Sequence, residues 1–353
     1  MLRDRMPIGL LSLAMLTACG GDQPRLPAAA TTPAEHAYVT NEDSHDITIV
    51  DTRTDSVIAT IPVGRRPRGV KVSPDGRTVF VALSGSPKCP PTMPDEECAK
   101  LASDKAADGV AVLDAGTRQV SRVLPAGSDP ETFDLGPGAA TIVVSNEDVG
   151  QASIVEVATG QVLVTVPVGK EPEGVTIHPD GTTAWITGET DHDVTVIDAR
   201  TGVRMTRIEV GKRPRALAFL PDGSRAYVTN EAGGTVSVID VASRTVLRTV
   251  PMGEGAKPMG VVAAPDGKRV YISTGRGRRI VVLDPATDSV IGSVEAGQRP
   301  WGIALTRDGS KLYAANGPSN DVSVIDTRTM TVVKTIPAGT TPWGVAIGVR
   351  TED

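Results

Sequence analysis

The residues best suited to ligand chemistry recur at one position of a short motif, Pro-x-Gly or a close variant of it, which the chain repeats seven times. The middle residue is tryptophan in two copies, although the chain has only three tryptophans. Aromatic rings stack on planar ligands and charged side chains hold ionic groups, so this position could form a binding site. The predicted ligand-binding residues are Arg68, Glu131, Glu173, Arg215, Met259, Trp301 and Trp343.

Charge around these motifs is segregated along the chain. Acidic residues gather in the third and fourth repeats, and basic residues gather in the fifth to seventh and at the start of the second. A polarised surface of this kind could orient a small anionic ligand, with Arg68 as its partner, or a partner protein. Alternatively, the proline and glycine only shape the loop, and the charged residues are solvated side chains.

Other catalytic and metal-binding motifs give weaker signals. The chain has no G-x-S-x-G, H-E-x-x-H or P-loop motif. His45 and His192 lie near aspartates and could each contact a cation, but they belong to the first and fourth repeats and cannot share one. Glu131 and Glu173 are the candidates for a general base. We predict no metal site, and the sequence does not identify a cofactor.

The spacing of the motif indicates how these residues are positioned. Its prolines are separated by steps of 63, 42, 42, 44, 42 and 42 residues. A fixed period near 42 is typical of a β-propeller. Within one repeat, such as 215–250, four short segments rich in β-branched residues are separated by turns. We therefore predict an all-β, seven-bladed propeller with four antiparallel strands per blade, in which the first strands line the central channel.

The two ends of the repeat array complement each other. Trp343–Ile347 resembles a first strand without followers, and His36–Thr40, Ile47–Asp51 and Val57–Ile61 resemble second, third and fourth strands without a leader. We expect these segments to form blade one together, which closes the ring and leaves no unpaired inner edge.

One repeat is longer than the others. The 63-residue step implies about 21 extra residues within an insertion at 84–108 of blade two, on the same side as the Pro-x-Gly loops. A long loop of this kind could cap the channel, present a docking surface, or be a tolerated insertion without a role.

The repeat resembles a known family. Tyr38–Asn41 and Tyr227–Asn230 spell YVTN, and the series PDG, YVTN, VSVID covers most of the array. This pattern is similar to the YVTN-type β-propeller repeat family. Finer features at Asp129–Phe133, Glu171–Gly174 and 316–322 resemble the subgroup associated with pyrroloquinoline-quinone-dependent (PQQ-dependent) alcohol catabolism. The resemblance implies a propeller and an association with that metabolism.

The N-terminus resembles a bacterial lipoprotein signal. Arg3 and Arg5 precede the apolar stretch Ile8–Met15, which is too short to span a bilayer as a helix. Leu16–Cys19 matches a lipobox, so we expect cleavage before Cys19 and lipid attachment to it. Gly20 follows, rather than the aspartate that favours inner-membrane retention in many Gram-negative bacteria. The expected location is the periplasmic side of the cell envelope, on the outer membrane in a Gram-negative cell.

These observations predict the organisation of the chain. An exported protein meets an oxidising compartment, so we expect a disulfide between Cys89 and Cys98. We predict a signal peptide at 1–18, a flexible tether at 19–35, a propeller at 36–348 and a tail at 349–353. The net charge of −6 disfavours nucleic acid as a partner.

Three classes of function fit this organisation. The first is a lipid-anchored binding module that takes a small anionic ligand or an exported redox protein and supports a PQQ-dependent dehydrogenase system. The second is a propeller enzyme of lactonase or lyase type that acts at the channel mouth. The third is a surface-layer or adhesion scaffold. The sequence favours the first, because only Glu131 and Glu173 offer a base near the axis.

Overall fold

The computed structural model describes residues 35–88, 93–98 and 100–349. The signal peptide, Cys19, nearly all of the tether, Cys89 and residues 350–353 lie outside this range, as does the side chain of Cys98. The lipid anchor and the disulfide therefore stay predictions. No helix within the described ranges has the length and apolar character needed to cross a membrane.

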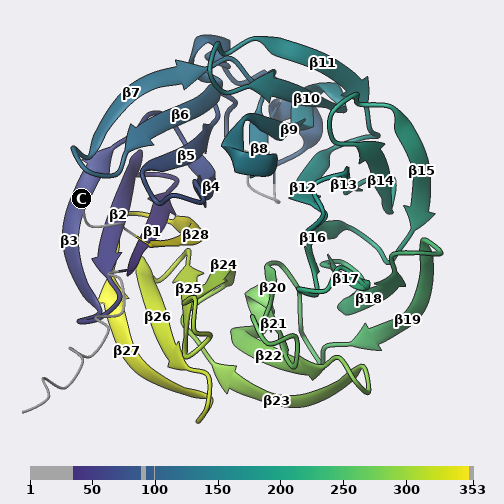
Figure 1. The fold of residues 1–353 in the computed structure, drawn as a ribbon. Helices are drawn as coiled ribbons and strands as arrows, with labels where there is room; N and C mark the ends of the chain where they lie inside the picture. Colours follow the sequence, from purple (N-terminus) through teal and green to yellow (C-terminus); the bar gives the residue numbers. More distant parts are fainter. Residues whose placement is uncertain (1–34, 89–92, 99, 350–353) are drawn as a thin grey trace, which may run out of the picture. The chain divides into compact units, whose positions relative to one another are not determined.

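Seven four-stranded antiparallel sheets form a closed ring (Figure 1). Blades one to three comprise, from the inner to the outer strand, β28 (Pro342–Val349), β1 (Glu35–Asn41), β2 (Asp46–Asp51) and β3 (Ser56–Pro62); β4 (Pro67–Val72), β5 (Thr78–Leu83), β6 (Gly109–Asp114) and β7 (Gln119–Leu124); and β8 (Pro130–Leu135), β9 (Thr141–Asn146), β10 (Gln151–Glu156) and β11 (Val162–Pro167).

Blades four to seven follow the same order. They comprise β12 (Pro172–Ile177), β13 (Thr183–Gly188), β14 (Asp193–Asp198) and β15 (Arg204–Glu209); β16 (Pro214–Phe219), β17 (Arg225–Asn230), β18 (Thr235–Asp240) and β19 (Thr245–Pro251); β20 (Val261–Ala263), β21 (Val270–Ser273), β22 (Arg279–Asp284) and β23 (Ser289–Glu295); and β24 (Pro300–Leu305), β25 (Lys311–Asn316), β26 (Asp321–Asp326) and β27 (Thr331–Pro337). The helices are short: α1 (Asp95–Cys98), η1 (Lys105–Ala107), η2 (Pro137–Ala139), η3 (Glu147–Val149) and η4 (Gly275–Gly277).

The predicted fold and ring closure are confirmed. The C-terminal β28 pairs antiparallel with β1, with His36 opposite Gly348 and Tyr38 opposite Ala346. Second and third strands are buried along nearly their whole length, because each blade packs face to face against its neighbours. Fourth strands, such as β19 and β27, are largely exposed at the rim.

The glycine of the Pro-x-Gly motif permits close approach between neighbouring inner strands. A Cβ on Gly344 would lie 2.6 Å from the carbonyl oxygen of Arg68, and a Cβ on Gly302 would lie 2.6 Å from that of Trp343. Real Cβ atoms do not approach an oxygen so closely, so glycine is required for the inner strands to converge. This structural role coexists with any role of the middle residue in binding.

A hydroxyl in most of the YVTN-like segments positions the next blade. In five of the seven blades, a Ser or Thr near the end of the second strand donates a hydrogen bond to the carbonyl oxygen of the middle motif residue in the following blade, at 2.6–2.9 Å. The pairs are Thr40 with Arg68, Ser145 with Glu173, Thr187 with Arg215, Thr229 with Met259, and Ser273 with Trp301. The repeat itself therefore fixes the backbone of the predicted ligand-binding positions.

Candidate functional site

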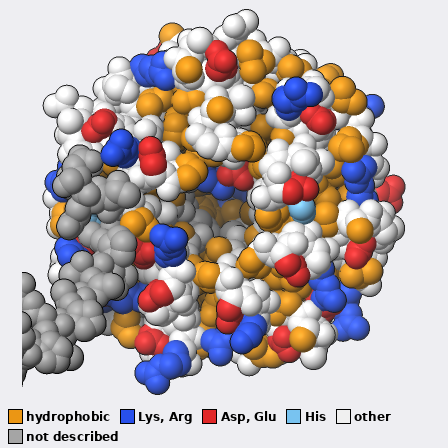
Figure 2. All heavy atoms as spheres, in the orientation of Figure 1, with side chains coloured by type: hydrophobic (Ala, Val, Ile, Leu, Met, Phe, Trp, Pro, Cys, Tyr) orange, Lys and Arg blue, Asp and Glu red, His pale blue; other side chains and the backbone are white. Residues whose placement is uncertain are grey.

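A cavity of about 1220 Å³ lies at the channel mouth where the Pro-x-Gly loops meet. Figure 2 shows that the ring is hollowed at its centre and that basic and acidic side chains lie inside the hollow. Six of the seven predicted ligand-binding residues line the cavity: Arg68, Glu131, Glu173, Arg215, Trp301 and Trp343.

Met259 differs from the other six. Its exposed fraction is 5%, and it does not line the cavity. In blade six the inner strand β20 begins only at Val261, whereas the other inner strands begin at the motif proline. The backbone amide of Met259 instead donates to the carbonyl of Ser273 at 2.9 Å. A shorter inner strand therefore removes this side chain from the predicted ring.

Arg68 is held by acidic side chains of the protein itself. Its guanidinium contacts Glu131, lies 3.3 Å from Glu42 Oε1 through Nε, and lies 3.5 Å from Glu147 Oε2 through Nη1. Burial alone would lower the pKa of Arg68, but the carboxylates of Glu42, Asp129, Glu147 and Glu173 outweigh burial and raise the pKa. The sequence suggested that Arg68 would bind an anionic ligand. In the structure, carboxylates of the protein already neutralise its positive charge.

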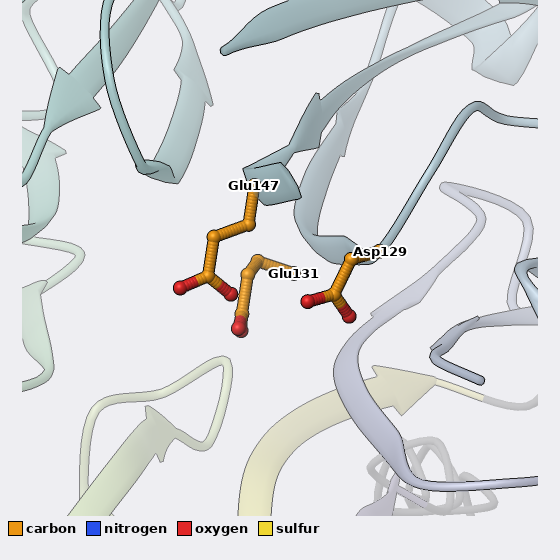
Figure 3. Close-up of side chains that lie close together, drawn as sticks. All are labelled: Asp129, Glu131 and Glu147. Atoms are coloured by element: carbon orange, nitrogen blue, oxygen red, sulfur yellow. The ribbon is translucent and has the colours of Figure 1, made fainter. Parts of the chain in front are cut away.

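Three carboxylates converge beside Arg68. Ligand oxygens of Asp129, Glu131 and Glu147 lie within 4.8 Å of one another, and the side chains point toward a common space (Figure 3). Such a group could coordinate a hard cation. Here the Arg68 guanidinium contacts Glu131 and Glu147, and the Ser84 hydroxyl donates to Asp129. Burial raises the pKa of Asp129, Arg68 opposes this rise, and Glu147 adds to it. Protein groups therefore compensate part of the charge of the cluster, because its one arginine is also shared with Glu42.

A second charged cluster surrounds Arg215. Its guanidinium lies 3.2 Å from Glu173 Oε1 and 3.7 Å from Glu231 Oε2, and it also contacts Glu189. Burial raises the pKa of Glu173 to about 8; Arg215 opposes this shift, while Glu189 and Glu147 reinforce it. Near neutral pH, Glu173 is thus a carboxyl group that can exchange a proton at the cavity wall.

Glutamates hold these arginines in place. The sequence indicated Glu147 and Glu189 only as part of the acidic group, and it did not predict that such glutamates pair with the arginines. The residue directly after the second strand is glutamate in four blades: Glu42, Glu147, Glu189 and Glu231. Arg66 Nη2 lies 2.8 Å from Glu42 Oε1, and Arg213 contacts Glu189 in the same way. The signal was present as a recurring Glu after YVTN-like segments.

Two histidines have equivalent structural roles. His45 Nδ1 lies 3.1 Å from the carbonyl oxygen of Glu42 and 3.2 Å from the backbone nitrogen of Arg66. His192 Nδ1 lies 2.9 Å from the carbonyl oxygen of Glu189 and 3.3 Å from the backbone nitrogen of Arg213. Each imidazole therefore supports the loop that enters the next blade. These contacts explain why the two histidines recur at matching positions of blades one and four.

The tryptophans form an aromatic corner of the cavity. The rings of Trp301 and Trp343 are 6.2 Å apart between centroids and inclined by 61°. The Arg299 guanidinium carbon lies 4.8 Å from the centroid of the Trp301 ring. In the closed ring predicted from the sequence, the motifs of Trp301 and Trp343 belong to neighbouring blades. The structure brings these two tryptophans together and adds Arg299 to them.

The insertion of blade two contributes to the cavity wall. Its described residues on the wall are Ser86, Pro87, Lys88, Met93, Leu101, Ser103 and Lys105. Lys88 Nζ lies 3.2 Å from Glu42 Oε2 and 2.9 Å from Asp43 Oδ2, and Lys105 contacts Asp148. The described part of the insertion therefore lines the channel mouth.

Sequence comparison identifies one family. Residues 204–338, from β15 through β27, match the family described as "Lactonase, 7-bladed beta-propeller". The match covers less than half of the chain. No curated protein matches the sequence.

Solved structures share the fold at low sequence identity. Hydrazine synthase of Kuenenia stuttgartiensis is 21% identical, with a TM-score of 0.67 over 79% of this chain and 89% of that chain. A putative 6-phosphogluconolactonase from Bacteroides uniformis is 16% identical, with a TM-score of 0.71 over 90% and 100%. One from Bacteroides fragilis is 18% identical, with a TM-score of 0.71 over 91% and 99%. At these identities the likeness concerns the fold.

Proposed function

We propose that the protein is a hydrolase that opens a lactone in the cavity at the channel mouth. The observation that carries this proposal is the buried Glu173 on the cavity wall, 3.2 Å from Arg215. The likeness of residues 204–338 to a seven-bladed lactonase family supports it further. It therefore takes precedence over the binding module that the sequence favoured.

Lactone hydrolysis needs a base, a water molecule and stabilisation of an oxyanion. In the proposed reaction, Glu173 accepts a proton from water as the water oxygen bonds to the lactone carbonyl carbon. The ring C–O bond then breaks, and the leaving oxygen takes up a proton, which yields a hydroxy acid. Arg215 orients Glu173, and its positive charge on the same wall favours the negative charge that develops on the carbonyl oxygen.

The pH dependence follows from the raised pKa of Glu173. The base must be ionised to accept a proton, so kcat/KM should rise as the pH increases through about 8. Glu173→Gln keeps the shape of the side chain but removes the base, and we expect a loss of about 10²-fold to 10⁴-fold in kcat/KM. Glu209→Gln, an exposed position on the outer strand of blade four, is the matched control.

The test is a hydrolysis assay with glucono-δ-lactone, its 6-phosphate and γ-butyrolactone, followed by proton release. Hydrolysis that Glu173→Gln abolishes and Glu209→Gln retains would support the proposal. A wild-type protein that hydrolyses none of a broad set of lactones above the buffer rate would refute it. So would a Glu173→Gln variant with the wild-type rate and pH profile.

The aromatic corner favours a second candidate function. We propose as the alternative that the cavity binds a planar acid without turnover, in support of a PQQ-dependent dehydrogenase. The contact between Trp301 and Trp343 provides a surface for such a ligand. Under either function, we propose that the protein acts in the cell envelope and is anchored through a lipid on Cys19. This candidate would be supported if calorimetric titration detects binding of PQQ and the protein hydrolyses no lactone.

A further inference from the structure

Arg299 differs from the other residues that precede the motif proline. In five of the seven loops, the side chain at this position bonds to another side chain: Arg66 to Glu42, Asp129 to Ser84, Glu171 to Thr190, Arg213 to Glu189, and Thr341 to Asp43. In a sixth, Lys257 approaches the carbonyl of Ala232 at 3.5 Å. Arg299 has neither a hydrogen bond nor an ion pair with any part of the chain that the structure describes.

The repeat explains how Arg299 lost its partner. Arg66 and Arg213 each pair with the glutamate that follows the second strand of the preceding blade. Blade seven keeps the arginine, but the corresponding residue of blade six is Gly275. Gly275 adopts a φ of +49°, and a Cβ there would lie 2.7 Å from the carbonyl oxygen of Lys257. The backbone of blade six therefore excludes the glutamate that would neutralise Arg299.

The surroundings of Arg299 favour an anion. Its guanidinium stacks at 4.8 Å on Trp301, which holds the plane in place and leaves its N–H donors without protein acceptors. Burial lowers the pKa of Arg299; Glu231 opposes this shift, and the charges of Arg276, Arg215 and Arg213 add to it. An anionic group beside Arg299 would relieve this repulsion.

We propose that the ligand of this cavity carries a carboxylate, which Arg299 binds through its N–H donors beside the Trp301 and Trp343 rings. The proposal rests on the hydrolase function and specifies its substrate class as a lactone with a carboxylate group. A planar guanidinium matches a carboxylate in bidentate geometry. Phosphate is the weaker match, because one unpaired arginine provides a single charge and a phosphate monoester carries nearly two at neutral pH.

The experiment compares three lactones of one sugar framework: glucono-δ-lactone, a glucarolactone that carries a carboxylate at C6, and the 6-phosphate. We expect the wild type to prefer the carboxylate over the neutral lactone, and Arg299→Gln to lose about 10-fold to 100-fold in kcat/KM for the carboxylate alone. Arg204→Gln removes an equal charge from an exposed residue on the outer strand of blade four that does not line the cavity, and it should change each rate by less than about 3-fold.

The outcomes separate this inference from the proposed function. Hydrolysis of the neutral and acidic lactones at rates that Arg299→Gln leaves unchanged would overturn the carboxylate site and keep the hydrolase. A larger effect of Arg299→Gln on the phosphate than on the carboxylate would overturn the choice of carboxylate. If no lactone is hydrolysed, calorimetric titration with glucarate decides: binding that Arg299→Gln weakens and Arg204→Gln retains supports the site, and equal binding by all three proteins refutes it. Melting temperatures of both variants establish that they are folded.

Discussion

Replacement of Glu42 by glutamine should destabilise the protein strongly, although the two side chains have almost the same volume. Glu42 is buried at the channel mouth, where it lies 2.8 Å from Arg66 Nη2, 3.3 Å from Arg68 Nε and 3.2 Å from Lys88 Nζ. Burial alone would raise its pKa, but the charges of Arg68, Arg66 and Lys88 outweigh burial and lower the pKa from 4.5 to about 2.

The size of the effect follows from this shift. A pKa lowered from 4.5 to about 2 corresponds to about 3 kcal/mol of unfolding free energy at pH 7. Because the pKa in the folded state is below that in the unfolded state, this contribution is complete well above pH 4.5 and declines as the pH falls toward 2. About half of it should remain near pH 3. Glutamine mimics the protonated carboxyl group, so the variant lacks the contribution at every pH.

Urea unfolding of the wild type and of Glu42→Gln between pH 3 and pH 7 measures the difference in unfolding free energy. Thermal unfolding at pH 7 measures the difference in melting temperature. We expect Glu42→Gln to lower the melting temperature by roughly 5 °C at pH 7. Glu97→Gln is the control, because Glu97 also pairs with a lysine, Lys100, at 2.8 Å, but on the exposed surface. That change should cost less than about 0.5 kcal/mol. Equal effects of the two substitutions, or a Glu42→Gln deficit that stays constant from pH 7 to pH 3, would refute the reasoning.

Four further predictions concern the site, the ring and the N-terminus. Trp343→Ala should weaken PQQ binding by roughly 10-fold to 100-fold in calorimetric titration with little change in melting temperature, and unchanged affinity would remove Trp343 from the site. Thr229→Val should cost about 1–2 kcal/mol in urea unfolding, because it strands a buried carbonyl of the next blade; a neutral effect would show that the interblade bond contributes little. Cys19→Ser should release the protein from washed membranes, and its persistence there would contradict the lipid anchor. Non-reducing mass mapping should link Cys89 to Cys98, and free thiols in freshly exported protein would contradict the disulfide.

The blade architecture could be predicted because its signals are local. Turn residues, β-branched alternation and the motif proline all act within a few residues, so their repetition at 42 residues defined seven blades. Closure followed from the segments at 343–347 and 36–61, which complete one blade only together, and β28 does pair with β1. The same periodicity brought Trp301 and Trp343 into contact at the cavity.

Which charged residues pair with one another depended on the tertiary structure. Arg68 and Arg299 have the same charge and lie on either side of the proline in the same motif. Arg68 contacts Glu131, 63 residues away, whereas Gly275 replaces the glutamate that would pair with Arg299. Likewise, Met259 follows the motif but leaves the cavity because β20 begins late. The sequence by itself determined the ring and the positions on it. Which charges were free for a ligand depended on distances of 3–4 Å between blades, because electrostatic pairing acts through space and not along the chain.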